Sequence, residues 1–371
     1  MRKSLTVLSL LFFLVIPLPV LSADVALVRL TSTLHQNFTG EFRNDDLAQE
    51  LTPSGRLGQL VFITPNKSRT WVVDPALIDE VVAMSGDYKL AIAAPPAGKE
   101  IAGAWLEQLK KVTAGNEVIA LAYGNPDVAM AKRLAPSELK LYYTYGKTAL
   151  EIALGRLVRS EPKKGWNRGS SKLSPLLRKN YGDNRKDLTR LSNVVNSADV
   201  LQLRMRLARL LSPELDAGSR AYFSYNARTA VGAQVNRLRV NPGKYQITTE
   251  KTILPVTVIN NFPVEVTVDI AMLAMNARIR VDSFKAVKLA ANSKVQLEVN
   301  ALVLAPGQTI VYAQMRDEDG SDVVPAASLS LNATVIDSRV TWFTTGAAIL
   351  LLLAAVTQSV RRVRRGHKNE I

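Results

Sequence analysis

An uncharged apolar run over residues 340–360 constrains this chain more than any other segment. A helix of about 21 residues rises roughly 31 Å, which is enough to cross the hydrocarbon core of a bilayer. The basic segment RRVRRGHK follows the run directly, and such clusters stay on the cytoplasmic side during insertion. The sequence therefore predicts a transmembrane helix over 340–360, a basic cytoplasmic tail over 361–371 and an exported region before the helix.

Residues 1–23 fit a secretory signal peptide. Arg2 and Lys3 precede an uncharged run that contains Pro17 and Pro19 and ends in small residues at 22 and 23. This order is typical of a cleavable signal sequence, and an uncleaved first membrane helix is the alternative. With the signal removed, the protein is expected to be a single-pass protein of the plasma membrane, with its N-terminal region outside and its C-terminal tail in the cytoplasm.

The sequence contains no cysteine and two histidines, His35 and His367. Without cysteine there is no disulfide framework, no thiolate metal site and no lipoprotein anchor, which fits a bacterial envelope better than a eukaryotic secretory route. The two histidines fall on opposite sides of the predicted membrane, so neither a paired-histidine metal site nor a Ser-His-Asp triad is expected. The sequence also lacks a glycine-rich phosphate loop, and we expect no metal and no cofactor.

Residues 24–159 alternate short apolar runs with helical patterns. The runs VALVRL, LGQLVFIT, TWVVD, YKLAIAA and NEVIALAY have the composition of strands. Between them, PALIDEVVAMSG, KEIAGAWLEQLKKVTAG and PDVAMAKRL carry apolar residues at helical spacing. This order predicts an α/β domain with a parallel sheet and crossover helices, which is either a small layered domain or part of a barrel.

Residues 160–241 are expected to form a basic helical connector. From 155 to 239 the chain has 18 Lys and Arg against 6 Asp and Glu, a net of +12 in a chain of +15. An exported excess of positive charge attracts lipid headgroups or anionic wall polymers, and Arg204, Arg206 and Arg209 are the candidates for binding such a component. The alternative is a solvated helical face. Nucleic acid is not expected as a partner outside the cell.

Residues 245–337 turn to period-two alternation. Val264, Val266, Val268 and Ile270 alternate with polar neighbours, and a turn is expected just before them over 260–263. About seven short strands in roughly 90 residues are typical of an antiparallel sandwich of the immunoglobulin-like kind. The sequence thus predicts an all-β domain directly before the membrane helix.

Two aspartates stand where parallel α/β sheets gather functional groups. Asp74 closes the run TWVVD, and Asp127 follows the run NEVIALAY within YGNPD. Sites in such sheets lie beyond the carboxyl ends of the strands, and two carboxylates that face one crevice could serve glycoside chemistry. Alternatively, each aspartate caps or complements the helix after it, because Asp74 precedes Pro75 and Asp127 adds negative charge to a first helical turn. We favour the second interpretation.

The order of several segments resembles a known family. The segments are WVVDPALIDEV, AGAWLEQL, VIALAYGNPDVAM and ILPVTVINNFPVEVTV, followed by the membrane helix and RRVRR. In this order the chain is similar to uncharacterised actinobacterial envelope proteins that carry a signal peptide and a single membrane helix. Members are often encoded beside the MviN-type flippase, which exports lipid-linked peptidoglycan precursors. The resemblance implies a location and a process, and it supplies no catalytic residues.

These features predict a membrane-anchored exported protein of unknown activity. We expect a non-catalytic partner or scaffold in bacterial cell-envelope assembly, with a lipid-linked precursor flippase or another envelope membrane protein as its partner. The alternative is a glycan-acting enzyme, or a degenerate relative of one, that uses carboxylates of the α/β domain. An open cleft lined by carboxylates would favour the enzyme, whereas a filled crevice would favour the binding role.

Overall fold

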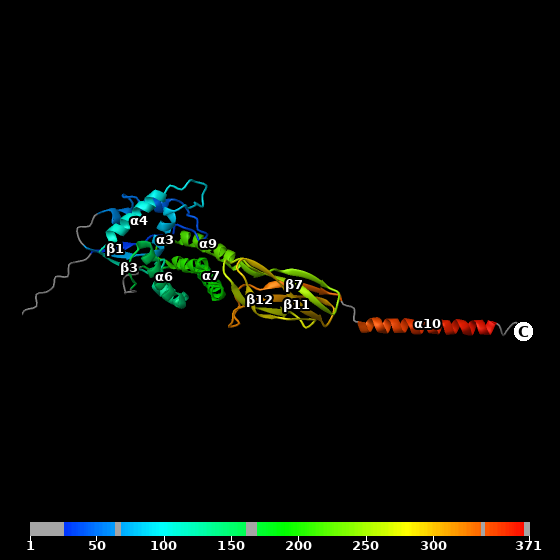
Figure 1. Cartoon of the computed structure of the whole chain (residues 1–371). Coiled ribbons are helices and arrows are strands. Elements are labelled where there is room, and N and C mark those ends of the chain that lie inside the picture. Colours follow the sequence, from blue (N-terminus) through cyan, green and yellow to red (C-terminus); the bar gives the residue numbers. More distant parts are fainter. Residues whose placement is uncertain (1–25, 64–67, 161–168, 335–337, 367–371) are drawn as a thin grey trace, which may run out of the picture.

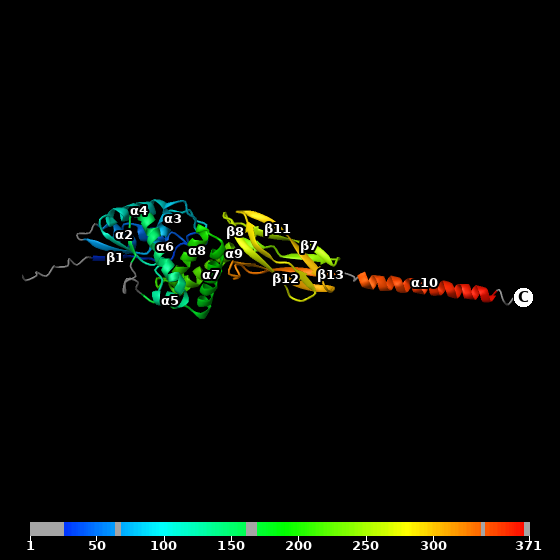
Figure 2. The ribbon, with the colours of Figure 1, turned by 60° about the horizontal axis from the view of Figure 1, so that its bottom comes forward.

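The computed structural model describes residues 26–63, 68–160, 169–334 and 338–366. It places a parallel α/β domain at one end, then a group of helices, a β-sandwich and a long final helix (Figure 1). The helical group also lies between the parallel sheet and the sandwich in the turned view (Figure 2). The expected signal peptide lies outside the described residues.

The α/β domain is built on a four-stranded sheet in which all described strands run parallel. Its order is sequential: β1 (Ala26–Leu30), β2 (Arg69–Val73), β3 (Glu117–Ala120) and β4 (Arg159–Ser160). Trp71, Val73 and Val118 are buried, as apolar runs of a covered parallel sheet require. The predicted parallel sheet is confirmed, and its sequential strand order is the order found in a barrel wall.

Six helices accompany this sheet within the described residues. They are α1 (Asp46–Leu51), α2 (Arg56–Phe62), α3 (Pro75–Ser85), α4 (Lys99–Thr113), α5 (Val128–Leu134) and α6 (Pro136–Leu154). The helices expected from sequence are α3, α4 and α5. In α4 the indole of Trp105 is fully buried and donates to the carbonyl of Leu57 at 3.2 Å, which joins α4 to α2.

Two strands expected in this domain are absent from the described residues, and both predictions were wrong. The run LGQLVFIT is mostly helix α2, in which Leu57 and Val61 are buried one turn apart while Gln59 is exposed. The run YKLAIAA forms no strand beyond an isolated bridge between Leu90 and Phe42. Residues 91–97 are exposed and include two prolines, which cannot donate to a ladder.

Helices also form the expected basic connector. They are α7 (Pro175–Val194), α8 (Ala198–Arg206), the short 3-10 helix η1 (Leu207–Leu211) and α9 (Ala217–Val235). Leu188, Leu191 and Val200 belong to an apolar core that continues into the sandwich and also includes Leu34 and Phe38 of the α/β domain. The helices are therefore packed against both of their neighbours.

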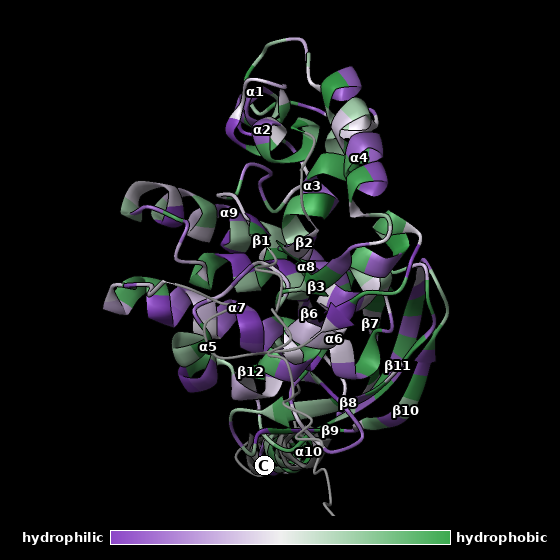
Figure 3. Ribbon diagram, turned by 90° about the vertical axis from the view of Figure 1, so that its left-hand side faces the viewer, coloured by the Kyte–Doolittle hydropathy of each residue, from purple (hydrophilic) through white to green (hydrophobic). Residues whose placement is uncertain are grey.

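The predicted sandwich is confirmed, and its strand pairs are antiparallel except for β13 with β6, which is parallel. One sheet has the order β10-β8-β12-β13-β6 and the other β5-β7-β11-β9. The strands are β5 (Leu238–Val240), β6 (Gly243–Ile247), β7 (Lys251–Asn260), β8 (Val266–Ala274), β9 (Ile279–Val281), β10 (Phe284–Leu289), β11 (Ser293–Val303), β12 (Gly307–Arg316) and β13 (Ala327–Ala333). Hydrophilic and hydrophobic residues alternate along β11 (Figure 3).

The first strand of the sandwich begins at Leu238, before the expected start at 245. The predicted turn at 260–263 is present, but it joins β7 to β8 across the two sheets and is therefore an arch between them. Asn260 is fully buried there, and its amide donates to the carbonyls of Val264, Leu289 and Ala290. The asparagine thus satisfies backbone acceptors that the arch leaves without strand partners.

The helix expected over 340–360 is present as α10 (Ser338–Gly366). It extends away from the sandwich (Figure 1), and Leu350, Leu351 and Leu352 are each about two-thirds exposed. Within the part of the chain that the structure describes, no helix reaches both the length and the apolarity needed to cross a membrane. A crossing by α10 stays a prediction.

Candidate functional site

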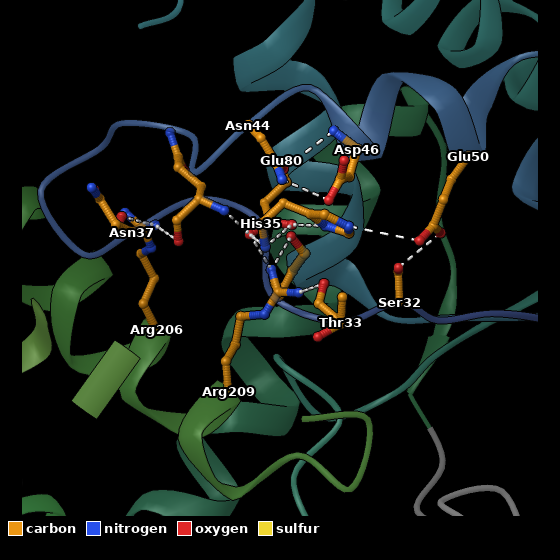
Figure 4. Close-up of polar contacts among 12 residues, drawn as sticks. Ser32, Thr33, His35, Asn37, Asn44, Asp46, Glu50, Glu80, Arg206 and Arg209 are labelled. Atoms are coloured by element: carbon orange, nitrogen blue, oxygen red, sulfur yellow. Dashed lines mark hydrogen bonds and ion pairs between the residues drawn. The ribbon is translucent and has the colours of Figure 1, made fainter. Parts of the chain in front are cut away.

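A buried polar network occupies the carboxyl edge of the parallel sheet (Figure 4). Asp74 directly follows β2, Glu80 lies on α3, and His35 follows β1. The relative exposures of these three side chains are 1%, 2% and 4%. Sites in parallel α/β folds gather at this edge, so the network is the candidate functional site.

Arg209 of η1 fills the centre of this network. Its guanidinium lies 2.8 Å from Glu80 Oε1 and donates to the carbonyls of Ala76 and Thr33 at 3.2 and 2.9 Å. Gly124, beyond β3, makes room for it: a Cβ at this position would lie 2.6 Å from Arg209 Cγ, and φ is +77°. The helical segment after the α/β domain therefore closes the crevice at the edge of the sheet.

Glu80 connects Arg209 to His35. Its carboxylate accepts from the backbone N–H groups of His35 and Gln36, and it lies 3.3 Å from His35 Nδ1. On the other side of the ring, His35 Nε2 lies 3.7 Å from Glu50, which also pairs with Arg56. The His35 ring thus lies between two glutamates, Glu80 and Glu50, and each glutamate also pairs with an arginine.

The pKa values follow from this arrangement. Burial alone would lower the pKa of His35, but hydrogen bonds to Glu50 and Glu80 raise it to about 9. Burial opposes ionisation of Glu80 and Glu50 as well, but Arg209 and His35 hold the pKa of Glu80 at about 2, and His35 and Arg56 hold that of Glu50 at about 2. At neutral pH the network is therefore a set of paired charges.

Asp74 differs from its two glutamate neighbours. Burial raises its pKa to about 6, although Arg209 and two backbone donors oppose the shift. The donors are Ala76 N at 3.0 Å and Gly124 N at 2.9 Å. Asp74 therefore caps α3, and its hydrogen bond from Gly124 N also links the end of β2 to the segment after β3.

Asp127 caps α5 by accepting from Met130 N at 3.0 Å. Its other carboxylate oxygen accepts from Ser171 N at 2.8 Å. None of the contacts that the structure gives for Asp127 reaches Asp74. The capping interpretation is confirmed for both aspartates, and each carboxylate accepts from its own pair of backbone N–H groups.

We expect Asp74→Ala to lower the free energy of unfolding by about 2 kcal/mol, because it removes a cap and leaves two buried N–H groups without an acceptor. Asp74→Asn keeps an acceptor oxygen at the site and should cost less. Urea unfolding of both variants would measure the difference. A fully stable Asp74→Ala protein that had lost its cellular function would contradict the capping role and favour catalysis.

The three arginines expected to bind anionic material all have partners inside the protein. Arg204 donates to both oxygens of the fully buried Glu138 at 2.7 and 2.8 Å. Arg206 lies over the ring of Phe38 and donates to the carbonyl of Asn37 at 2.7 Å. With Arg209 in the network above, these contacts correct the expectation of an exposed cationic surface at these positions.

A shallow groove lies beside the network, between α3 and α6. It has a volume of about 390 Å³, and its lining includes Asp79, Val82, Tyr145, Ile152 and Gln202. Val82 and Ile152 are 43% and 77% exposed. Burial raises the pKa of Asp79, which accepts from Tyr123 Oη at 2.8 Å. The groove therefore combines apolar side chains with one carboxylate.

Within the described residues, no group of three His, Cys, Asp or Glu side chains could hold a metal ion. Sequence reasoning missed His35, Glu80 and Arg209 as a unit, because they lie far apart along the chain. One signal could have found Glu80: an acidic residue on the mostly apolar helix PALIDEVVAMS requires a buried partner.

Comparisons with known proteins add a family. A family model described as "Family of unknown function (DUF6049)" matches residues 156–368. No curated protein matches the sequence.

Solved structures are similar to about a quarter of the chain. WR4, an MSP family member of C. elegans, is 15% identical with a TM-score of 0.21, over 26% of this chain and 98% of that one. PapD-like domain 7 of human CEP192 is 12% identical with a TM-score of 0.22, over 27% and 87%. Salmonella alpha-2-macroglobulin is 17% identical with a TM-score of 0.21, over 26% and 7%. These values carry no information about function.

Proposed function

We propose that this chain, which belongs to the DUF6049 family of unknown function because the family model matches more than half of it, is a non-catalytic binding or scaffold protein of the bacterial cell envelope. The observation that carries the proposal is the filled crevice at the carboxyl edge of the parallel sheet. Arg209 is 2% exposed there and pairs with Glu80, so this carboxylate stabilises the interior of the protein and does not face solvent. A glycosidase instead needs its two carboxylates open to a sugar.

We further propose that α10 holds the protein at the plasma membrane, with the N-terminal part outside the cell. Leu350, Leu351 and Leu352 support this, because successive helical residues turn by about 100° and these three leucines point in different directions. All three are exposed, and a helix that is apolar all round is suited to lipid. The basic segment after the apolar run favours a cytoplasmic tail.

The partner in this proposal is an envelope membrane protein that handles lipid-linked peptidoglycan precursors, and it binds at the groove between α3 and α6. Exposed Ile152 and Val82 support the choice of this surface, because large apolar side chains exposed together mark interaction sites. Asp79 adds one polar group that can fix the orientation of a partner.

Photo-crosslinking in live cells tests the proposal. The full chain should carry a photoreactive amino acid at Ile152, and a control chain should carry it at Tyr225 on α9, which is 75% exposed. We expect a defined crosslinked product with a membrane protein from position 152 and none from position 225. Equal products from both positions, or none from either, would contradict a binding role for the groove.

A parallel assay addresses the enzyme alternative. The purified chain is incubated with peptidoglycan and its soluble fragments, and products are separated by mass spectrometry. We expect no cleavage. Cleavage that disappears in Asp74→Asn, at unchanged stability, would overturn the non-catalytic proposal in favour of a glycan-acting enzyme.

A further inference from the structure

The end of the sandwich from which α10 leaves has an unusual surface. It is formed by the segment between β6 and β7, the turn between β8 and β9, the turn between β11 and β12, and Thr334 after β13. Hydrogen bonds hold these segments together: Thr334 N donates to Ile247 O, Val303 N to Glu250 O, and Leu304 N to Arg278 O. The surface is therefore one ordered face.

Large apolar side chains project from this face. Met275 is 62% exposed, Leu304 is 61% exposed and Ile253 is 57% exposed. Among the described residues of the sandwich, these are the large hydrophobic side chains that are more than half exposed. Met275 and Leu304 lie in turns, so their exposure is not part of the strand alternation that explains most of the sandwich surface.

Cationic side chains lie beside two of these apolar side chains, Leu304 and Ile253. Arg278 donates to Pro306 O at 2.7 Å, which holds its guanidinium against the turn that carries Leu304. Lys251 and Arg280 line a hollow of about 600 Å³ together with Ile253. Asp282 also lines this hollow, and it accepts from the amide of Asn300 at 3.2 Å. Arg278 thus lies at the turn that carries Leu304, and Lys251 and Arg280 lie beside Ile253.

Covalent geometry keeps this face close to α10. Four residue steps separate Thr334 from Ser338, and an extended chain spans at most about 3.6 Å per step. The first residue of α10 therefore lies within roughly 15 Å of Thr334. If α10 enters a membrane near its first residues, the end of the sandwich is close enough to contact that membrane.

We propose that this end of the sandwich docks on an anionic lipid surface. Met275 and Leu304 enter the boundary between headgroups and acyl chains, and Lys251, Arg278 and Arg280 meet the lipid phosphates. Interleaved apolar and cationic side chains suit the lipid interface, where burial of apolar area and attraction to anionic lipids act together. Docking would set the distance between the α/β domain and the membrane surface. The inference rests on the proposed membrane attachment through α10.

Single-site labelling tests the docking, because the chain has no cysteine of its own. The full chain is reconstituted into nanodiscs that contain anionic lipid with brominated acyl chains. An environment-sensitive fluorophore is attached at Leu304→Cys, at Met275→Cys, or at Lys288→Cys as a control on β10. We expect quenching at 304 and 275 and none at 288. Incorporation is checked separately by co-elution with the discs.

The cationic contribution has a matched control. Replacing Lys251, Arg278 and Arg280 by glutamine should abolish the quenching at Leu304→Cys, as should discs of neutral lipid. Replacing Lys285, Lys288 and Lys294 by glutamine removes the same charge elsewhere on the sandwich and should leave the quenching intact.

The outcomes separate the two proposals. A chain that does not co-elute with the discs would overturn the membrane attachment through α10. A chain that co-elutes without quenching at 304 and 275 would overturn the docking alone. Equal quenching in neutral and anionic discs would also overturn it, because the face would then bind lipid without the proposed charge contribution.

Discussion

Replacing Arg209 by methionine is expected to lower the free energy of unfolding by about 3–5 kcal/mol, because the change leaves a buried glutamate without its cation. Glu80 is 2% exposed and pairs with Arg209 at 2.8 Å. Methionine keeps much of the side-chain volume, so the loss reports charge pairing more than packing. Urea unfolding, followed by circular dichroism, measures the change.

Two further variants identify the cause. Arg190→Met removes an exposed arginine from α7 and should change stability by no more than about 0.5 kcal/mol. Adding Glu80→Gln to Arg209→Met should recover part of the loss, because the unpaired charge is then removed. If Arg209→Met costs no more than Arg190→Met, the closed crevice is not held by this ion pair, and the main support for a non-catalytic role is lost.

The sandwich was the most predictable part of the chain. Its strands are exposed on one face, so Val266, Val268 and Ile270 alternate with polar residues. This alternation shows which side chains of the strand face the core. Strand β6 was missed because it pairs with β13, which lies far away along the chain, and the short strand β5 was missed because it pairs with β7 across the intervening β6. Local alternation cannot supply that information.

The parallel sheet was less predictable, because its strands are buried on both faces and show no alternation. The run containing Leu57 and Val61 is as apolar as a buried strand, yet it is a helix. Periodicity alone cannot separate a short buried strand from a buried helical segment. The aspartates were easier, because Asp74 stands before Pro75 in a local pattern that predicts a helix start.

The site itself could not be predicted from local patterns. Arg209 lies in a segment whose positive charge suggested a solvated or lipid-binding face, and its partner Glu80 belongs to a different domain. The net charge of a segment shows an excess of cations, but it does not show which of these side chains point into the protein and which point into solvent. The same limit applies to Arg204, whose buried partner Glu138 is on α6.

Stability is expected to fall as the pH rises from about 6.5 to about 9, by on the order of 3 kcal/mol, through loss of the proton on His35. The folded protein holds this proton more tightly than the unfolded chain, because Glu50 and Glu80 raise the pKa of His35 from 6.5 to about 9. The stability that this proton contributes is therefore fully present below pH 6.5 and is lost as the pH rises through about 9. On the acid side, the lowered pKa values of both glutamates give a contribution that is present above 4.5 and lost as the pH falls toward 2.

The loss of stability above pH 6.5 gives the clearer test, because in acid the contribution of Asp74 changes with pH in the opposite direction to that of the two glutamates. Its raised pKa gives a contribution that is present below 3.8 and lost as the pH rises through about 6. Urea unfolding of the wild-type chain and of His35→Gln, at about pH 6 and about pH 9.5, isolates the histidine. The wild type should lose stability between these values, and the variant should change much less. Equal losses in both proteins would show that His35 is not held protonated between the two glutamates, which would remove one of the two cations from the network that closes the sheet edge.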